Sequence, residues 1–302
     1  MLHIDRLTHT YDNGTRALDD VSLVIPRGMF GLLGPNGAGK STLMRCIATL
    51  QTPSSGSLRF GDVDVLAQPE RLREHLGYLP QDFGVYPRVS ALDLLDHLAV
   101  LKGFAARGER RETVERLLQQ VNLWDVRKKA VAGCSGGMRQ RFGIAQALIG
   151  NPQLIIVDEP TAGLDPEERN RFNNLLAEIG QSVVVILSTH IVDDVTDLCS
   201  RMAILAGGRI VAAGEPRELI ERQRGRIWAR TVAKSEVEAI RLEANVITSR
   251  LREGRTVVHV AATESPGEGF ERAEAALEDV YFATLAEQRQ SAPSQASAGP
   301  SA

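Results

Sequence analysis

Residues 34–42 read Gly-Pro-Asn-Gly-Ala-Gly-Lys-Ser-Thr, a complete match to the phosphate-binding pattern G-x-x-x-x-G-K-[ST]. An apolar stretch ending at Leu33 precedes it, and a helical pattern follows from Thr42. Its glycines allow backbone conformations barred to residues with a Cβ, and a close approach to an anion. Successive N–H groups then point inward, and the next helix adds its dipole. The stretch therefore predicts a nucleoside triphosphate site; the alternative is a glycine-rich turn with a chance lysine.

Two side chains of this loop are expected to have separate tasks. Lys40 would bring a positive charge to the β- and γ-phosphates, and Ser41 would offer a hydroxyl to Mg²⁺. The backbone of the loop would surround the phosphates. The predicted nucleotide-binding residues here are Gly34, Pro35, Asn36, Gly37, Ala38, Gly39, Lys40, Ser41 and Thr42.

The composition is that of an ordinary globular protein. The chain has 302 residues, of which 43% are hydrophobic and 24% charged, enough for a large α/β domain and a smaller one. A net charge of −3 gives no reason to expect nucleic acid as a partner. No apolar run approaches the roughly 18 residues that cross a bilayer, and the N-terminus does not resemble a secretion signal. Any membrane role is therefore expected to come through a partner chain.

Up to about residue 220 the chain alternates strand and helix patterns, which predicts an α/β fold with a mainly parallel sheet. Short apolar segments before residue 34, separated by turns, predict an antiparallel β part. Helical patterns predict an insertion over about 85–150. After it, strands are expected at 154–158, 183–188, 202–205 and 209–213, with a helix over 166–179.

The character of the sequence changes after Gly214. Residues 226–286 read as strand, helix, two strands and a helix over 269–286, which predicts a small separate α+β domain. Residues 287–302 are expected to form a disordered tail, because from Gln290 onward the chain is rich in Ser, Ala, Gln, Pro and Gly and carries no charge.

A second motif follows the insertion. Leu154-Ile155-Ile156-Val157-Asp158-Glu159 describes a buried strand that ends in two carboxylates, at the edge of the sheet where the phosphate loop also lies. Asp158 suits the Mg²⁺ shell, and Glu159 is placed to orient or deprotonate the attacking water. The alternative is an exposed acidic pair at the end of a core strand.

A third motif, Cys134-Ser135-Gly136-Gly137-Met138-Arg139-Gln140, begins a helix and forms another anion site. Two such loops cannot enclose one γ-phosphate within a single simple fold, which indicates a second chain. With this motif, residues 2 to about 220 resemble the nucleotide-binding subunits of ABC transporters in motif order and spacing.

The resemblance assigns further residues. Tyr11 matches the aromatic residue that stacks on adenine, and Gln81 matches the glutamine that contacts Mg²⁺ and the attacking water. Gly163-Leu164-Asp165 matches the loop that crosses the dimer interface, and His190 matches the switch histidine beside Glu159. Ser135, Gly136 and Gly137 match the signature sequence, which contacts the γ-phosphate bound by the opposite protomer.

The chain departs from the family at Cys134, where an apolar residue, most often leucine, is usual. Cysteine is small and often buried, so the packing should survive. Cys46 and Cys199 lie in helical, apolar surroundings and are expected in the core. Isolated cysteines without metal spacing are typical of reduced thiols in the cytosol.

The resemblance implies an ATPase that works as a dimer, either of two copies or of this chain and a paralogue. ATP with Mg²⁺ would be bound between the two chains, and hydrolysis would drive integral membrane permease subunits. The protein would then be cytoplasmic and peripheral on the inner face of the cell membrane. The expected permease contact is the loop Asp82-Phe83-Gly84-Val85-Tyr86, because aromatic residues in polar loops often anchor interfaces.

Weaker features of the sequence bear on the direction of transport and on the choice between a transporter subunit and other classes of ABC protein. Leu277-Glu278-Asp279-Val280-Tyr281-Phe282 is similar to the end of drug- and antibiotic-exporter subunits, which favours export over import. A soluble ABC protein of translation or DNA repair is the alternative class. Translation factors usually carry two such domains, and repair members have a very long coiled coil between the positions of Gln81 and Ser135. A binding module without catalysis is opposed by the presence of Glu159 and His190.

Overall fold

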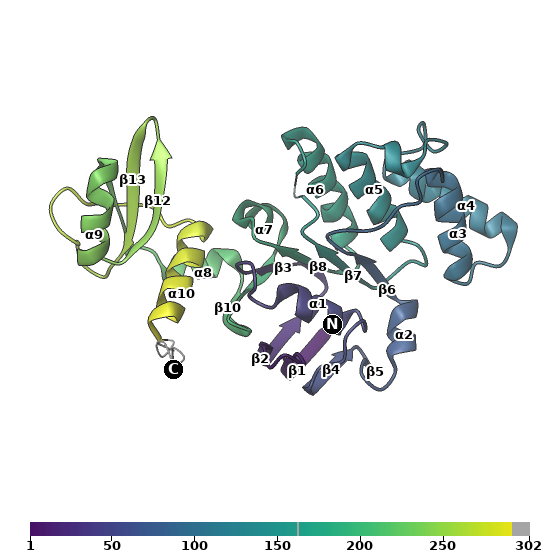
Figure 1. Ribbon diagram of the computed structural model, residues 1–302, viewed down its shortest axis with the longest axis horizontal. Coiled ribbons are helices and arrows are strands. Elements are labelled where there is room, and N and C mark those ends of the chain that lie inside the picture. The colour runs from purple at the N-terminus through teal and green to yellow at the C-terminus, as the bar shows by residue number, and fades with distance from the viewer. Residues whose placement is uncertain (162, 292–302) are drawn as a thin grey trace, which may run out of the picture. The chain divides into compact units, whose positions relative to one another are not determined.

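The computed structural model describes residues 1–161 and 163–291 of the chain (Figure 1). The chain divides into two compact units, Met1–Ile210 and Val211–Ala302. Among the helices of the described ranges, none combines the length and apolar character that a membrane crossing needs.

A six-stranded sheet forms the centre of the first unit, in the order β10-β9-β3-β8-β7-β6. The pairings from β6 through β7, β8 and β3 to β9 are all parallel. Every residue of β7 and β8 is buried, as in a parallel sheet covered on both faces. This confirms the α/β fold with a mainly parallel sheet. The strands are β3 (Gly28–Leu33), β6 (Leu76–Leu79), β7 (Leu154–Asp158), β8 (Val184–Thr189), β9 (Arg201–Ala206) and β10 (Arg209–Gly214).

A second, antiparallel sheet contains the N-terminal strands, as predicted. Its order is β2-β1-β4-β5, and its buried side chains share one core with the helix α1 and the central sheet. The phosphate loop therefore lies where β3 leads into α1, between two sheets that fix its position (Figure 1). The elements are β1 (Leu2–Thr10), β2 (Arg16–Ile25), α1 (Lys40–Ile47), β4 (Ser55–Phe60) and β5 (Val63–Asp64).

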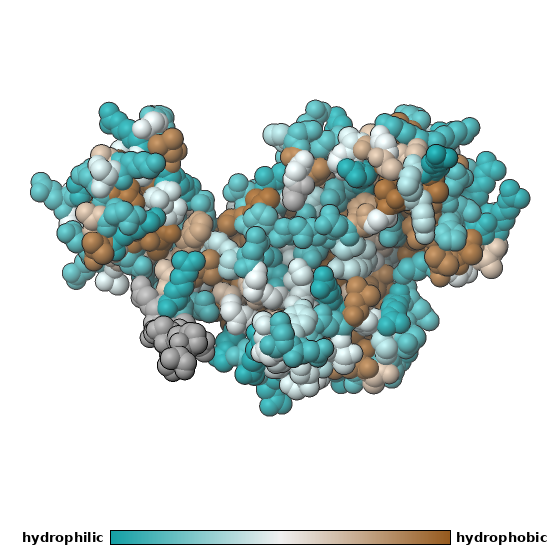
Figure 2. All heavy atoms as spheres, in the orientation of Figure 1, coloured by the Kyte–Doolittle hydropathy of each residue, from teal (hydrophilic) through white to brown (hydrophobic). Residues whose placement is uncertain are grey.

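The helical insertion lies between β6 and β7, as predicted, and contains α3 (Ala91–Leu101), α4 (Arg107–Gln120), η1 (Val131–Gly133) and α5 (Gly136–Ala147). Ser90 caps the start of α3 and Ser135 caps the start of α5, and their side chains accept backbone N–H bonds from Asp93 and Met138. On the face shown in Figure 2, hydrophobic residues gather beside β6 and at the end of α3. The other helices of this unit are α2 (Pro69–Glu74), α6 (Pro166–Gly180) and α7 (Val192–Leu198).

The second unit has an antiparallel sheet in the order β12-β13-β11-β14, with α9 and α10 contributing to separate cores. Val237 and Ile240 of α9 pack with Val258, whereas Ala283 of α10 packs with Ile227. The unit is therefore α+β. Its elements are α8 (Pro216–Arg222), β11 (Ile227–Val232), η2 (Lys234–Glu236), α9 (Val237–Glu243), β12 (Val246–Arg252), β13 (Arg255–Ala261), β14 (Glu271–Arg272) and α10 (Leu277–Ser291).

The last helix differs from the helix expected over 269–286. The chain first forms β14, which pairs with β11, and α10 begins only at Leu277. The start is fixed by the buried Asp279, whose carboxylate accepts a bond from Ala276 N and lies 2.7 Å from His259 Nδ1 of β13. The helix continues through 287–291, which the sequence analysis assigned to the tail, and residues 292–302 lie outside the described part.

Candidate active site

The phosphate loop has little room for side chains at its glycines. Gly39 has φ 105°, in the left-handed region, and a Cβ there would lie 2.4 Å from the carbonyl oxygen of Ala17. A Cβ at Gly34 would lie 2.4 Å from the carbonyl oxygen of Leu205. The loop backbone is thus packed against its neighbours at both ends, and α1 follows directly from Lys40.

The loop forms one wall of a cavity of about 530 Å³. The cavity brings together the predicted residues Tyr11, Gln81, Glu159 and the loop from Pro35 to Thr42. The other lining residues were not predicted from the sequence; they are Thr15, Arg16, Ala17, Gly207 and Gly208.

Lys40 is a nearly buried cation at this cavity, with 5% of its surface exposed. Its Nζ donates to the carbonyl oxygens of Gly34 at 2.6 Å and Pro35 at 3.2 Å, and lies 3.9 Å from Glu159 Oε1. Burial lowers the pKa of Lys40, and the negative charges of Glu159 and Asp158 oppose that shift. The ammonium group is therefore held within reach of both the loop and the carboxylate.

Glu159 is the point at which the three predicted catalytic side chains meet. Gln81 Nε2 donates to its Oε2 at 3.4 Å, and His190 Nδ1 lies 3.1 Å from its Oε1. Glu159 has φ 48°, a left-handed conformation that is strained for a residue before proline. Its N–H donates to the carbonyl oxygen of Ser188 at 2.8 Å. Backbone strain at a residue beside a phosphate loop is typical of active sites.

Asp158 has a property that suits a cation site. It is 4% exposed, and its Oδ1 is buried without a hydrogen-bond partner among the described residues. The residue beside it on β8 is Ser188, whose Oγ is buried and unpartnered in the same way. A buried carboxylate oxygen without a protein donor fits a cation or its bound water.

Tyr11 lies at the edge of the cavity. Its hydroxyl is 2.9 Å from Thr42 Oγ1, and this hydrogen bond lowers the pKa of Tyr11. The ring meets His9 edge to face, with centroids 4.8 Å apart. Stacking of the ring on adenine stays a prediction.

Ser135, Gly136 and Gly137 are not among the residues that line the phosphate-loop cavity. They lie at the start of α5, where a Cβ at Gly137 would be 2.3 Å from Glu168 Oε2 of α6. The fold therefore places the signature residues against the start of α6. The phosphate-loop cavity of the same chain is lined without them.

Arg16 and the pair Gly207–Gly208 could have been suspected from local signals. Arg16 follows a turn close to Tyr11, and its guanidinium pairs with Asp19 at 2.6 Å. The two glycines form the turn between β9 and β10, where Gly208 N donates to the carbonyl oxygen of Ala38. A basic residue near the predicted adenine site and a glycine pair at a strand end were the available signals.

The two aromatic residues of the loop after Gln81 differ in their surroundings. Phe83 stacks on Phe142 of α5, with centroids 6.5 Å apart, and is half-buried. Tyr86 is 62% exposed. Phe83 therefore joins this loop to the helical insertion, and Tyr86 is the aromatic side chain of the pair that is available to another molecule.

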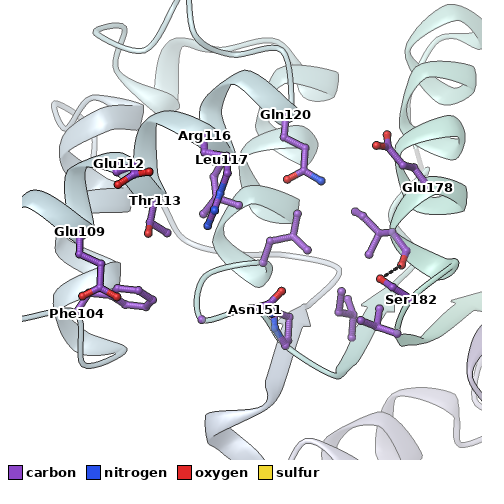
Figure 3. Close-up of a pocket in the computed structure, with 16 residues that line it drawn as sticks. Phe104, Glu109, Glu112, Thr113, Arg116, Leu117, Gln120, Asn151, Glu178 and Ser182 are labelled. Carbon is purple, nitrogen blue, oxygen red and sulfur yellow. Dashed lines mark hydrogen bonds between the residues drawn. The ribbon is translucent and has the colours of Figure 1, made fainter.

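Another cavity, of about 650 Å³, lies where α4 faces the segment before β7 and the end of α6 (Figure 3). Its polar side chains include Glu109, Glu112, Arg116 and Glu178, and it contains none of the predicted site residues. The phosphate-loop cavity is therefore the candidate site for nucleotide binding and hydrolysis.

Comparisons with known proteins identify relatives of this chain. The family described as ABC transporter matches residues 18–162. The phosphonates import ATP-binding protein PhnC of Chromohalobacter salexigens is 38% identical over 235 residues, which cover 73% of this chain and 86% of that protein. The daunorubicin/doxorubicin resistance ATP-binding protein DrrA of Streptomyces peucetius is 37% identical over 210 residues, or 68% and 63% of the two chains.

A solved structure is similar over most of this chain. The dimeric ATP-binding cassette MJ0796, in a post-hydrolysis state bound to ADP and Pi, has a TM-score of 0.65 and 26% identity. The match covers 71% of this chain and 98% of that one.

We expect Glu159→Gln to lower the rate of ATP hydrolysis by about 10²–10⁴-fold, because the amide cannot accept a proton from water. ATP affinity, measured by calorimetry, should be retained. Glu178→Gln is the matched control, since this glutamate is exposed on α6 and should leave the rate unchanged. Near-normal turnover of Glu159→Gln would remove this residue from the catalytic role.

Proposed function

The chain belongs to the ABC transporter ATP-binding proteins, and we propose that it drives an exporting membrane permease through ATP-dependent closure of a dimer. It is an ABC ATPase and the ATP-binding subunit of a membrane transporter. The observation that carries the ATP-driven part of this proposal is the meeting of Lys40, Gln81 and His190 at Glu159, beside the phosphate loop.

Hydrolysis follows from the positions of these side chains. Lys40 would exchange its carbonyl partners for the β- and γ-phosphates and offset their negative charge. Glu159 would accept a proton as the water oxygen bonds to the γ-phosphorus and the bond to the bridging oxygen of ADP breaks. Gln81 and His190 contact Glu159 and would hold that water in line.

The same edge of the sheet fits Mg²⁺. Ser41, Gln81 and Asp158 would hold the ion, and the unpartnered Oδ1 of Asp158 is the observation that supports this. When bound, Mg²⁺ offsets charge on the phosphate oxygens. We therefore propose that the ATPase is Mg²⁺-dependent.

A shared site would explain why the signature residues are absent from the phosphate-loop cavity. In a head-to-tail dimer, Ser135 and Gly137 of one chain would complete the site of the other, so that ATP affinity and closure are coupled. The similar cassette MJ0796 is dimeric with ADP and Pi bound, which supports this arrangement. Loss of the γ-phosphate would let the pair reopen.

An apolar groove supports the proposal of a permease partner, which would hold the subunit at the membrane. The groove, of about 330 Å³, lies beside β6, the strand that leads to Gln81. Leu50 and Leu101 line it and are 64% and 71% exposed, and Lys102 joins its two walls by donating to the carbonyl oxygens of Arg73 and Leu76. Exposed apolar residues around a groove are typical of a protein interface.

The second unit is the basis for proposing export. Leu277, Asp279, Val280 and Tyr281 are buried, so the segment that resembles exporter subunits belongs to the core of this unit. The similar proteins include both the resistance protein DrrA and the import protein PhnC, so the proposal of export rests on the C-terminal segment.

We expect a mixture of two inactive variants, Lys40→Ala and Ser135→Ala, to recover part of the ATPase activity. A mixed dimer has one site with both lesions and one site with neither. Each variant alone should stay inactive, and Ser135→Ala should still bind ATP as a monomer. Loss of ATP binding in that monomer would contradict the shared site.

We expect Leu101→Glu to weaken binding to the proposed permease subunit by at least about tenfold, because it places a charge in the apolar groove. Val24→Glu is the control, since Val24 is 51% exposed on β2, away from the groove residues. Co-purification in detergent measures both. Equal binding of the two variants would exclude the groove as the contact.

We expect ATP added outside inverted membrane vesicles that carry this chain and its permease to drive uptake of an exported compound. A panel of radiolabelled hydrophobic drugs, daunorubicin included, is the probe. ATP-dependent release of a preloaded solute instead would indicate import.

A further inference from the structure

Asp194 of α7 is a completely buried carboxylate outside the phosphate-loop cavity. A buried charge is costly unless it is paired and hydrogen-bonded. Arg169 Nε and Nη2 each lie 2.9 Å from its Oδ1, and Asn173 Nδ2 donates to the same oxygen at 3.3 Å. The hydroxyl of Thr161 donates to its Oδ2 at 2.7 Å.

These partners come from two segments that follow the catalytic carboxylate Glu159 in the sequence. Thr161 is two residues beyond Glu159, and Arg169 and Asn173 are one turn apart on α6. Asp194 itself is four residues after His190, in the first turn of α7. One carboxylate therefore connects the segment after Glu159, the helix α6 and the helix that follows His190.

The strained backbone of Glu159 depends on the contacts that Asp194 makes. A left-handed backbone at a residue before proline persists only when its surroundings fix it on both sides. On one side Glu159 N donates to Ser188, and beyond Pro160 the Thr161 hydroxyl is bound to Asp194. Release of Thr161 would free the second side and let Glu159 relax away from His190.

We propose that Asp194 is a positioning residue for ATP hydrolysis, which holds Glu159, through Thr161, and His190 in register with the phosphate loop of the same chain. It does not touch the nucleotide. Its effect is on the placement of the attacking water, and misplacement of a reacting group by about 1 Å can cost about 10²-fold in rate.

The first test compares Asp194→Asn with Thr161→Val. The asparagine keeps the shape but loses the charge, and the valine removes only the hydroxyl. We expect kcat to fall about 10- to 100-fold for Asp194→Asn and in the same direction for Thr161→Val, with ATP affinity within about twofold. Asp193→Asn is the matched control, because it removes an exposed charge from the same turn of α7 and should leave kcat unchanged.

The double variant Thr161→Val/Asp194→Asn separates positioning from general destabilisation. If the two residues act as one unit, its kcat should be no lower than that of Asp194→Asn. Losses that multiply would overturn the proposal, as would normal kcat in folded Asp194→Asn. A fall in ATP affinity as large as the fall in kcat would also overturn it. Should Asp194→Asn fail to fold, Thr161→Val alone decides by the same kcat and affinity criteria.

A second test asks which site Asp194 serves, and it rests on the proposed shared-site dimer. Mixed with Ser135→Ala, Asp194→Asn should recover activity, because one site of the mixed dimer then has neither lesion. Mixed with Lys40→Ala it should stay inactive, because each site has one. The reverse pattern would place Asp194 at the partner's site and overturn the proposal. Failure of the Lys40→Ala and Ser135→Ala control mixture would count against the shared site alone, while the kcat comparison still decides on Asp194.

Discussion

The approach of Lys40 to Glu159, 3.9 Å across the mouth of the phosphate loop, is the interaction on which the rest of the site depends. It brings a cation from the start of α1 to a carboxylate from the end of β7, which are far apart in the sequence. Strands β3, β7 and β8 run parallel, so their carboxyl ends meet at one edge of the sheet. The antiparallel sheet on the other side of α1 then fixes the loop against that edge.

The charges at this edge are arranged for ligands of both signs. Lys40 is almost buried, and its ammonium group donates to the carbonyl oxygens of Gly34 and Pro35, which are neutral acceptors. A phosphate would take their place as a stronger, charged acceptor. Asp158 has a buried oxygen with no donor among the described residues, which suits a cation. The polar groups of the site are thus more fully satisfied with a triphosphate and its metal than by the protein alone.

The parts that the sequence could predict are those in which local geometry restricts the residue type. Gly39 needs a left-handed φ, and residues 154–157 of β7 are all apolar because both faces of the sheet are covered, so both were evident from residue types alone. Contacts that form only when distant segments fold together were not evident from residue types. Arg16 reaches the cavity by way of the β1–β2 turn, and Phe83 turns inward because Phe142 lies beneath it. The late start of α10 depends on a bond between Asp279 and His259, which are 20 residues apart in the sequence and beyond any local pattern.

Neighbouring residues in the first turn of α6 contact different helices, which connects two parts of the site. Successive helical residues point about 100° apart, so Glu168 pairs with Arg141 of the signature helix α5 while Arg169 pairs with Asp194 of α7. Glu168 also lies directly against Gly137, where an added Cβ would be 2.3 Å from its carboxylate oxygen. Through these contacts, a shift of α6 would act on both the signature residues and the segment around Glu159. In a dimer with shared sites, these belong to different nucleotides, so this one turn of helix would link hydrolysis at one site to the grip on the other.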